Sequence, residues 1–133
     1  PLLTAALAGG GGNSKITETI FDHRFRYTQG LVQMGACIQV EGNTAWIDGR
    51  PLHGARVEAA DLRGGAALVV AALSAQGKSF VEETRHIDRG YAGLWEVLAT
   101  LGGRIGREMP PPDAAVKKIP SKKQIYLAFG AKR

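Results

Sequence analysis

The sequence predicts an α/β (α+β) fold built from a repeated βαβαββ unit of about 65 residues. Two observations support this prediction. Segments with apolar residues at helical spacing alternate with short β-rich runs, and glycines end most of them. Similar residues also recur in the same order about 65 positions apart, and Arg24 and Arg89 are one such pair. We expect a truncated first copy over about residues 1–50, without its opening strand, and a complete second copy over about residues 55–108.

The first copy is expected to start with a helix over 2–8, which ends in a flexible glycine turn over 9–13. Gly42 and Asn43 are a two-residue turn signal, so the runs on either side of them predict a β-hairpin. The remaining elements expected in this copy are a strand over 15–21, a helix over 26–34, and hairpin arms over 37–40 and 44–48.

The second copy follows the same order. An alanine-rich segment after Asp61 predicts a buried helix, and Gly77 stops it. The elements expected in this copy are a strand over 56–59, a helix over 62–75, a strand over 78–84, an amphipathic helix over 91–101 and a strand over 104–107.

The composition is that of a soluble globular chain. Its 133 residues are 44% hydrophobic and 22% charged, which suits one domain or one piece of a larger protein. No apolar run approaches the roughly 18 residues of a membrane helix, and no signal sequence directs export. A single cysteine cannot form an internal disulfide, which favours a reducing compartment. We therefore expect a cytoplasmic protein with no membrane segment.

The net charge of +5 is concentrated in a Pro-rich and basic tail over 109–133, because the rest of the chain is neutral. No aromatic residues interleave with the basic ones to form a groove for nucleic acid. We interpret the tail as a solvated segment or a weak polyanion site, and we do not expect nucleic acid as a partner.

Three arginines lie where an apolar run passes into a helical pattern: Arg24, Arg63 and Arg89. A helix N-terminus stabilises anions, and a guanidinium adds a bidentate, charge-assisted grip. Arg63 follows Asp61, which is either a helix cap beside a surface arginine or a carboxylate that orients an anion-binding one. A single arginine is most often a solvated surface residue. Three at similar places predict a site for phosphate or carboxylate.

The other reactive side chains receive structural interpretations. His86 has no partner at metal-ligand spacing, so we interpret it as a packed or solvent-facing histidine and expect no metal and no cofactor. Cys37 follows Gly35 and Ala36 in a predicted strand and has no adjacent base, so we expect it to be a small core residue.

Several phrases together resemble one family in their order and spacing. They are Thr17-Glu18-Thr19-Ile20-Phe21-Asp22-His23-Arg24-Phe25, Met34-Gly35-Ala36, Val40-Glu41-Gly42-Asn43-Thr44-Ala45, Asp61-Leu62-Arg63 and His86-Ile87-Asp88-Arg89-Gly90-Tyr91. Over residues 1–108 the chain resembles the C-terminal part of the UDP-N-acetylglucosamine 1-carboxyvinyltransferases, enolpyruvyl transferases of peptidoglycan synthesis that are similar to EPSP synthase. The resemblance implies part of an inside-out α/β barrel, with two domains of three repeated units each.

The resemblance also implies an activity and roles for individual residues. The reaction would move the enolpyruvyl group of phosphoenolpyruvate to the 3′-hydroxyl of UDP-N-acetylglucosamine, by addition and then elimination of phosphate. Arg63 and Arg89 resemble the pair that grips phosphoenolpyruvate and stabilises the anionic intermediate. Asp61 resembles a supporting carboxylate in the same cleft. The residues that resemble UDP-sugar contacts are Ile20, Phe21 and Arg24.

Two catalytic groups of the family have no match in the chain. The catalytic aspartate lies just upstream of the phrase that matches Pro1-Leu2-Leu3, and the reactive cysteine lies on the other domain and does not match Cys37. We therefore expect the chain to be inactive alone and to need the remainder of the enzyme, in cis or as a partner chain. Two alternatives stay open. One is a stand-alone module that binds a UDP-sugar or another phosphorylated ligand, and the other is a regulatory or scaffold protein whose basic tail docks a partner.

Overall fold

The computed structural model describes residues 1–108 and 126–130, and its elements follow a repeated order. The first copy contains α1 (Leu2–Gly9), β1 (Gly12–Thr17), α2 (Thr28–Gln33), β2 (Cys37–Glu41) and β3 (Thr44–Gly49). The second copy contains β4 (Arg56–Glu58), α3 (Leu62–Ser74), β5 (Lys78–Glu82), α4 (Arg85–Asp88), α5 (Leu94–Thr100), β6 (Ile105–Glu108) and β7 (Tyr126–Gly130). Across the described part of the chain, every helix is too short or too polar to cross a membrane.

Strand pairing reveals the same repeat in both sheets. The first sheet has the order β1-β3-β2, and β3 is antiparallel to both neighbours. The second has the order β4-β5-β7-β6, and β7 is antiparallel to β5 and β6. Strands β5, β7 and β6 therefore match β1, β3 and β2. Strand β4 pairs parallel with β5 and has no counterpart among the described residues of the first copy. The predicted fold of one truncated and one complete βαβαββ unit is confirmed.

The last strand of the complete unit lies inside the segment that the sequence assigned to the tail. We predicted no element there, yet β7 occupies the position between β5 and β6. The prediction failed because a strand in the middle of a sheet is defined by its two partners rather than by its own composition. Residues 109–125 and 131–133, and with them the rest of the predicted tail, lie outside the described residues.

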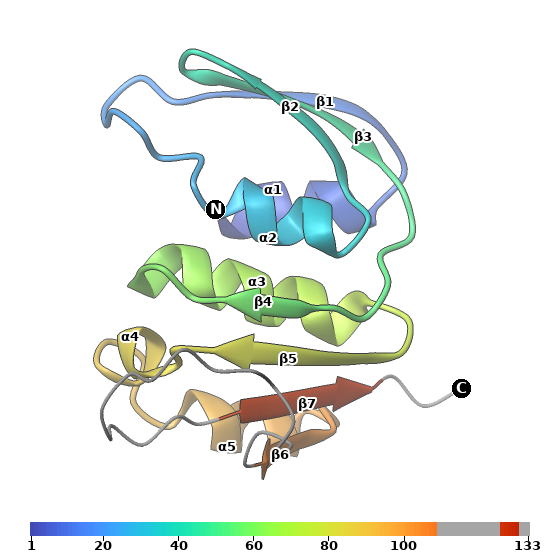
Figure 1. The fold of residues 1–133 in the computed structure, drawn as a ribbon, viewed down its shortest axis with the longest axis vertical. Coiled ribbons are helices and arrows are strands. Elements are labelled where there is room, and N and C mark those ends of the chain that lie inside the picture. The colour runs from blue at the N-terminus through green and yellow to red at the C-terminus, as the bar shows by residue number, and fades with distance from the viewer. Residues whose placement is uncertain (109–125, 131–133) are drawn as a thin grey trace, which may run out of the picture.

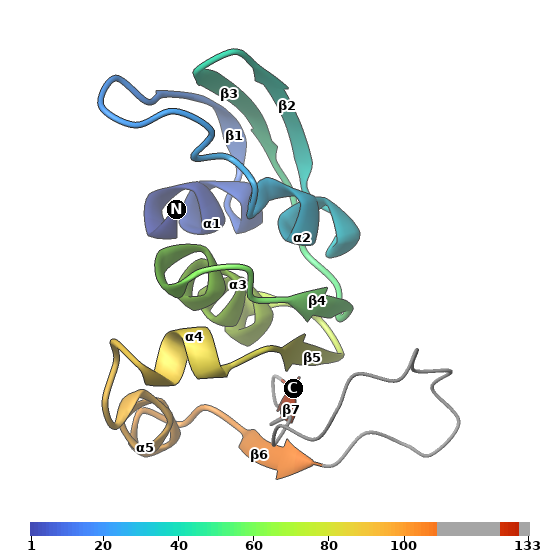
Figure 2. The same ribbon diagram turned by 60° about the vertical axis from the view of Figure 1, so that its left-hand side comes forward.

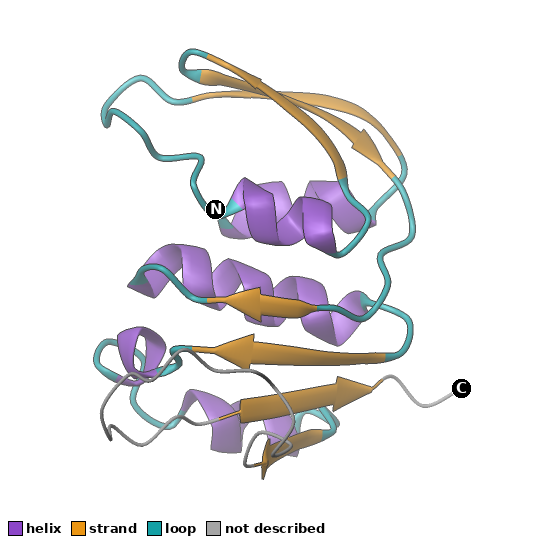
Figure 3. Cartoon of the chain, viewed as in Figure 1, coloured by secondary structure: helices purple, strands orange, loops and turns teal. Residues whose placement is uncertain are grey.

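The helices lie on the inner side of the strands. Helices α1 and α2 lie beneath the three-stranded sheet, and α3 packs on α1 on the side away from that sheet (Figures 1 and 3). Helix α3 also packs on β5 of the second sheet, as the turned view shows (Figure 2). Strands outside and helices inside are the inside-out arrangement that the resemblance implied.

Small residues let the three inner helices approach closely. Alanines are buried on both α1 and α3, among them Ala5 and Ala71. Between α2 and α3, a Cβ added to Gly30 would lie only 2.6 Å from a methyl carbon of Leu68. The close contact buries Leu68 fully and fixes α2 against the helix that carries Arg63.

Strand β1 lies earlier in the sequence than we predicted. It begins at Gly12, inside the expected flexible turn, and ends at Thr17 rather than at residue 21. Asn13 pairs with Asp48 of β3, so the backbone partner outweighs the poor strand propensity of glycine and asparagine. Residues 18–21 leave the sheet and form the start of a loop.

The second copy differs from the prediction before α5. The expected helix over 91–101 begins only at Leu94, because Gly93 adopts a φ of 71°, which lies outside the right-handed helical region. Strand β5 ends at Glu82 rather than at residue 84, and a short helix, α4, occupies part of the turn that we expected between this strand and the helix. Arg89 is the C-terminal cap of α4 and not a residue at the start of α5.

The expectation that Cys37 is a core residue is wrong, because Cys37 is exposed. It lies in β2 on the same face as Gln39, while Ile38 between them is half-buried on the opposite face. Cys37 pairs with Asp48 and Gln39 pairs with Trp46, a tryptophan that is itself 48% exposed. This face of the first sheet therefore meets solvent.

Candidate functional site

The start of α3 and the end of α4 form one surface beyond the carboxyl ends of the parallel strands β4 and β5. The two helices contact each other, and α4 and the start of α3 lie on the left-hand side of Figure 1, where the arrows of β4 and β5 point. A Cβ added to Gly90 would lie 2.5 Å from a methyl carbon of Leu62, so the Gly90 backbone packs against the Leu62 side chain. Arg89 precedes Gly90 and Arg63 follows Leu62, and both arginines are exposed. The structure thus brings the two predicted arginines to adjacent segments.

Asp61 is the N-terminal cap of α3. The Gly64 amide donates a hydrogen bond of 2.7 Å to Oδ1 of Asp61. A Cβ on Gly64 would lie 3.1 Å from the other carboxylate oxygen and 3.0 Å from Cβ of Tyr27, so this turn is tightly packed. The cap fixes the first turn of α3, where the positive end of the helix dipole adds to the charge of Arg63.

The loop after β1 places Arg24. Oε1 of Glu18 accepts hydrogen bonds from the amides of Ile20, at 2.9 Å, and Phe21, at 3.3 Å. The hydrogen bond from the Ile20 amide is the main reason why the pKa of Glu18 is lowered. The guanidinium carbon of Arg24 lies 4.2 Å from the centre of the Phe21 ring, a cation–π contact. His23, between them, has a φ of 55°.

This loop lies near the start of α3. Tyr27, which follows this loop, lies against the first turn of α3, where a Cβ added to Gly64 would be 3.0 Å from the Tyr27 Cβ. The loop, the start of α3 and α4 lie on the same side in Figure 1. The segments that carry the predicted site residues therefore lie on one side of the molecule although they are far apart in the sequence.

The two predicted apolar contacts, Ile20 and Phe21, are 79% and 54% exposed. Phe21 also lines a cavity of about 300 Å³. The residues that line it are Glu18, Phe21, Asp22, His23, Arg24, Phe25, Gly42 and Asn43. Its walls combine an aromatic ring, a guanidinium and carboxylates, which suits a ligand with polar and apolar parts.

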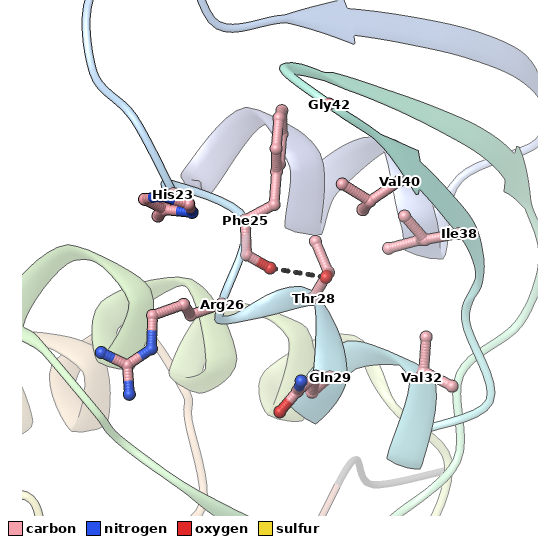
Figure 4. A pocket seen from close by; sticks show the side chains of 9 residues that line it. All are labelled: His23, Phe25, Arg26, Thr28, Gln29, Val32, Ile38, Val40 and Gly42. Atoms are coloured by element: carbon pink, nitrogen blue, oxygen red, sulfur yellow. Dashed lines mark hydrogen bonds between the residues drawn. The ribbon is translucent and has the colours of Figure 1, made fainter.

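A larger cavity of about 550 Å³ adjoins it between α2 and β2 (Figure 4). Figure 4 shows Val32 of α2 across from Ile38 and Val40 of β2. Nearby, the Thr28 hydroxyl donates a 2.6 Å hydrogen bond to the Phe25 carbonyl. The residues that line both cavities are His23, Phe25 and Gly42. The larger cavity has mostly apolar walls, although His23 and Arg26 also line it.

Two residues that support the site were not predicted from the sequence. Glu18 anchors the loop by accepting a hydrogen bond from the Ile20 amide two residues later. Acidic residues are common in loops, so the sequence alone does not indicate this hydrogen bond. Trp95, which is 7% exposed, donates its indole N–H to Asp88 and ties the end of α4 to α5. Within residues 1–108, no group of three His, Cys, Asp or Glu side chains could hold a metal ion.

The sequence profile of the family described as EPSP synthase (3-phosphoshikimate 1-carboxyvinyltransferase) matches residues 3–98. This match covers most of the chain and agrees with the repeated βαβαββ order of the elements. The chain therefore belongs to the EPSP synthase family.

Within that family the chain is similar to UDP-N-acetylglucosamine 1-carboxyvinyltransferases. It is 51% identical over 110 residues to the enzyme named UDP-N-acetylglucosamine 1-carboxyvinyltransferase 2 of Caldanaerobacter subterraneus subsp. tengcongensis, a match that covers 82% of this chain and 26% of that protein. It is also 51% identical over 107 residues to the UDP-N-acetylglucosamine 1-carboxyvinyltransferase of Anaeromyxobacter sp. strain Fw109-5, a match that covers 80% of this chain and 25% of that protein. The chain thus spans 26% or less of the length of these relatives. The resemblance inferred from the sequence is confirmed.

Solved structures have the same fold. The crystal structure of the enolpyruvyl transferase NikO from Streptomyces tendae matches with a TM-score of 0.69 and 34% identity, over 75% of this chain and 24% of that one. The EPSP synthase of Acinetobacter baumannii matches 97% of this chain and 27% of its own, with a TM-score of 0.66. At 20% identity, this second likeness concerns the fold alone.

Proposed function

We propose that the chain supplies part of the active site of a UDP-N-acetylglucosamine 1-carboxyvinyltransferase. This enzyme would transfer the enolpyruvyl group of phosphoenolpyruvate to the 3′-hydroxyl of UDP-N-acetylglucosamine and release phosphate, the first committed step of peptidoglycan synthesis. One observation carries the proposal. Arg63 at the start of α3 and Arg89 at the end of α4 lie on neighbouring segments, in a chain that is 51% identical to an enzyme of that name.

The two arginines suit phosphoenolpyruvate, which carries a phosphate and a carboxylate. Each guanidinium can form a bidentate, charge-assisted pair with one anionic group, and the positive end of α3 adds to their field. Addition of the sugar hydroxyl to the double bond gives a tetrahedral intermediate that keeps both anionic groups. Elimination of phosphate then restores the double bond in the product. Positive charge held in place through both steps lowers their barriers.

The loop after β1 suits the second substrate. Ile20 and Phe21 offer apolar surface, and Arg24 offers a cation to a UDP-sugar, beside the cavity of about 300 Å³. Asp61 would orient Arg63 from the N-terminal cap of α3. The catalytic aspartate and cysteine of the family would come from the remainder of the enzyme, so the chain alone would be inactive. A cytoplasmic location belongs to the same proposal.

The experiment that tests the proposal compares Arg89→Ala with Arg85→Ala in the full-length gene product that contains this chain. Arg85 is an exposed residue of the same short helix and pairs with Glu83 at 2.7 Å, so it is a matched control. Arg89→Ala should lower kcat/KM for phosphoenolpyruvate by about 100-fold, on the scale of losing one donor to a developing anion. Arg85→Ala should stay within about 3-fold of wild type. Equal kinetics of the two variants would refute the proposal.

A further inference from the structure

We propose that Glu18 is a positioning residue for the UDP-sugar contact surface. Its carboxylate holds the backbone of Ile20 and Phe21 in the conformation that presents both side chains outward. Glu18 acts through this backbone rather than through its own contact with substrate. The identity of the ligand rests on the proposed function, whereas the anchoring of the loop does not.

The Glu18 carboxylate accepts backbone hydrogen bonds just beyond the end of the sheet. The pairing of β1 with β3 ends at Thr17, and one further amide, that of Glu18, donates to the Asn43 carbonyl at 2.8 Å. Among the described residues, no strand pairs with the next part of the loop. The Glu18 side chain folds forward and accepts from the amides of Ile20 and Phe21, so one side chain replaces a missing strand partner.

The other end of the loop is held by a backbone reversal and a cation–π contact. His23 has a φ of 55°, a region in which residues other than glycine are uncommon and in which histidine, asparagine and aspartate are enriched. The reversal brings the Arg24 guanidinium to 4.2 Å from the Phe21 ring centre. The loop is therefore held both before and after Phe21.

The exposure of the two side chains needs such an anchor. Ile20 is 79% exposed and Phe21 is 54% exposed, although burial of large apolar side chains is favourable. A loop without fixed hydrogen bonds would favour conformations in which these side chains are more buried. With the Glu18 hydrogen bonds in place, both side chains stay exposed before a ligand binds, which reduces the entropy lost on binding.

Three substitutions separate anchoring from charge. Glu18→Gln keeps an Oε1 acceptor without the charge, Glu18→Ala removes the acceptor, and Glu96→Ala removes an exposed carboxylate in the first turn of α5 as a control. In the full-length gene product, the amide proton resonances of Ile20 and Phe21 should titrate with the Glu18 carboxylate in wild type. They should lose this titration in both Glu18 variants and shift toward solvent-exposed values only in Glu18→Ala. Unchanged amide resonances in Glu18→Ala would overturn the anchor.

Affinity for UDP-N-acetylglucosamine, measured by calorimetry, tests the consequence. Glu18→Ala should weaken binding by about 10-fold and raise KM for the UDP-sugar with little change in KM for phosphoenolpyruvate. Glu18→Gln should stay within about 3-fold of wild type, as should Glu96→Ala. Wild-type affinity in Glu18→Ala would overturn the positioning role. A wild type that binds no UDP-sugar would refute the proposed function instead, and the amide resonances would still decide whether Glu18 holds the loop.

Discussion

Three substitutions separate the capping role of Asp61 from the orienting role that we propose for it. Asp61 accepts the Gly64 amide at 2.7 Å as the cap of α3, so Asp61→Ala should lower the free energy of unfolding by about 1 kcal/mol. Asp61→Ser and Asp61→Asn keep a side-chain acceptor but lose the charge. They should cost only a few tenths of a kcal/mol, the share of a carboxylate near the positive end of a helix dipole.

The order of the three variants in kcat/KM should differ from their order in the free energy of unfolding. If the carboxylate orients Arg63, activity needs the charge, so Asp61→Ser should lose more than about 10-fold in kcat/KM although its fold is nearly as stable as wild type. Urea unfolding of the chain and steady-state kinetics of the full-length gene product measure the two quantities. Activity that follows stability across the three variants, with Asp61→Ser near wild type, would refute the orienting role and leave Asp61 as a helix cap alone.

Three further predictions concern the scaffold. Tyr27→Phe should lower stability by about 1–2 kcal/mol in urea unfolding, because the Thr4 hydroxyl, 1% exposed and 2.8 Å from the phenol oxygen, loses its partner; adding Thr4→Val should recover part of the loss. Burial raises the pKa of Tyr27, so above about pH 10 the folded state keeps a proton that the unfolded state releases. The free energy of unfolding of the wild type should therefore fall above about pH 10, and Tyr27→Phe should lack this contribution to the fall. Gly54→Ala should cost about 3 kcal/mol or more, since its Cβ would lie 2.1 Å from a backbone oxygen, whereas Gly11→Ala, with nothing within 4 Å, should be nearly neutral. Cys37 should react with a thiol reagent in the folded protein, and labelling only after unfolding would contradict its exposure.

The sequence predicted those elements whose signals are local. Asp61 begins α3 as a cap, and Gly42, with a φ of 57°, turns the β2–β3 hairpin as its turn residues indicated. The order of elements also followed from the repeat, because both copies preserve their glycine stops. Local signals of this kind need no knowledge of distant partners.

The sequence could not predict elements whose partners are distant. Asn13 is a strand residue only because β3 lies beside it, and β7 is a strand only between β5 and β6. The exposure of Cys37 was predictable, since it shares a strand face with Gln39, but the small apolar character of a free cysteine favoured a core position more strongly. The meeting of the α3 start with the Gly90 backbone depends on how α4 packs, which no local pattern encodes.

The repeat explains why two of the site arginines lie at matching places and yet meet different neighbours. Arg24 follows β1 and precedes α2, and Arg89 follows β5 and precedes α5, so each lies after the corresponding strand of its unit. Shared sheet order fixes this backbone position in both copies, but it does not fix the side chains around it. Arg24 stacks on Phe21, whereas Arg89 lies beside Asp88, which Trp95 holds. Since the contacts of Arg24 and Arg89 share no residue, substitutions at one should leave the other in place, and a double variant should show nearly additive losses in binding the two proposed substrates.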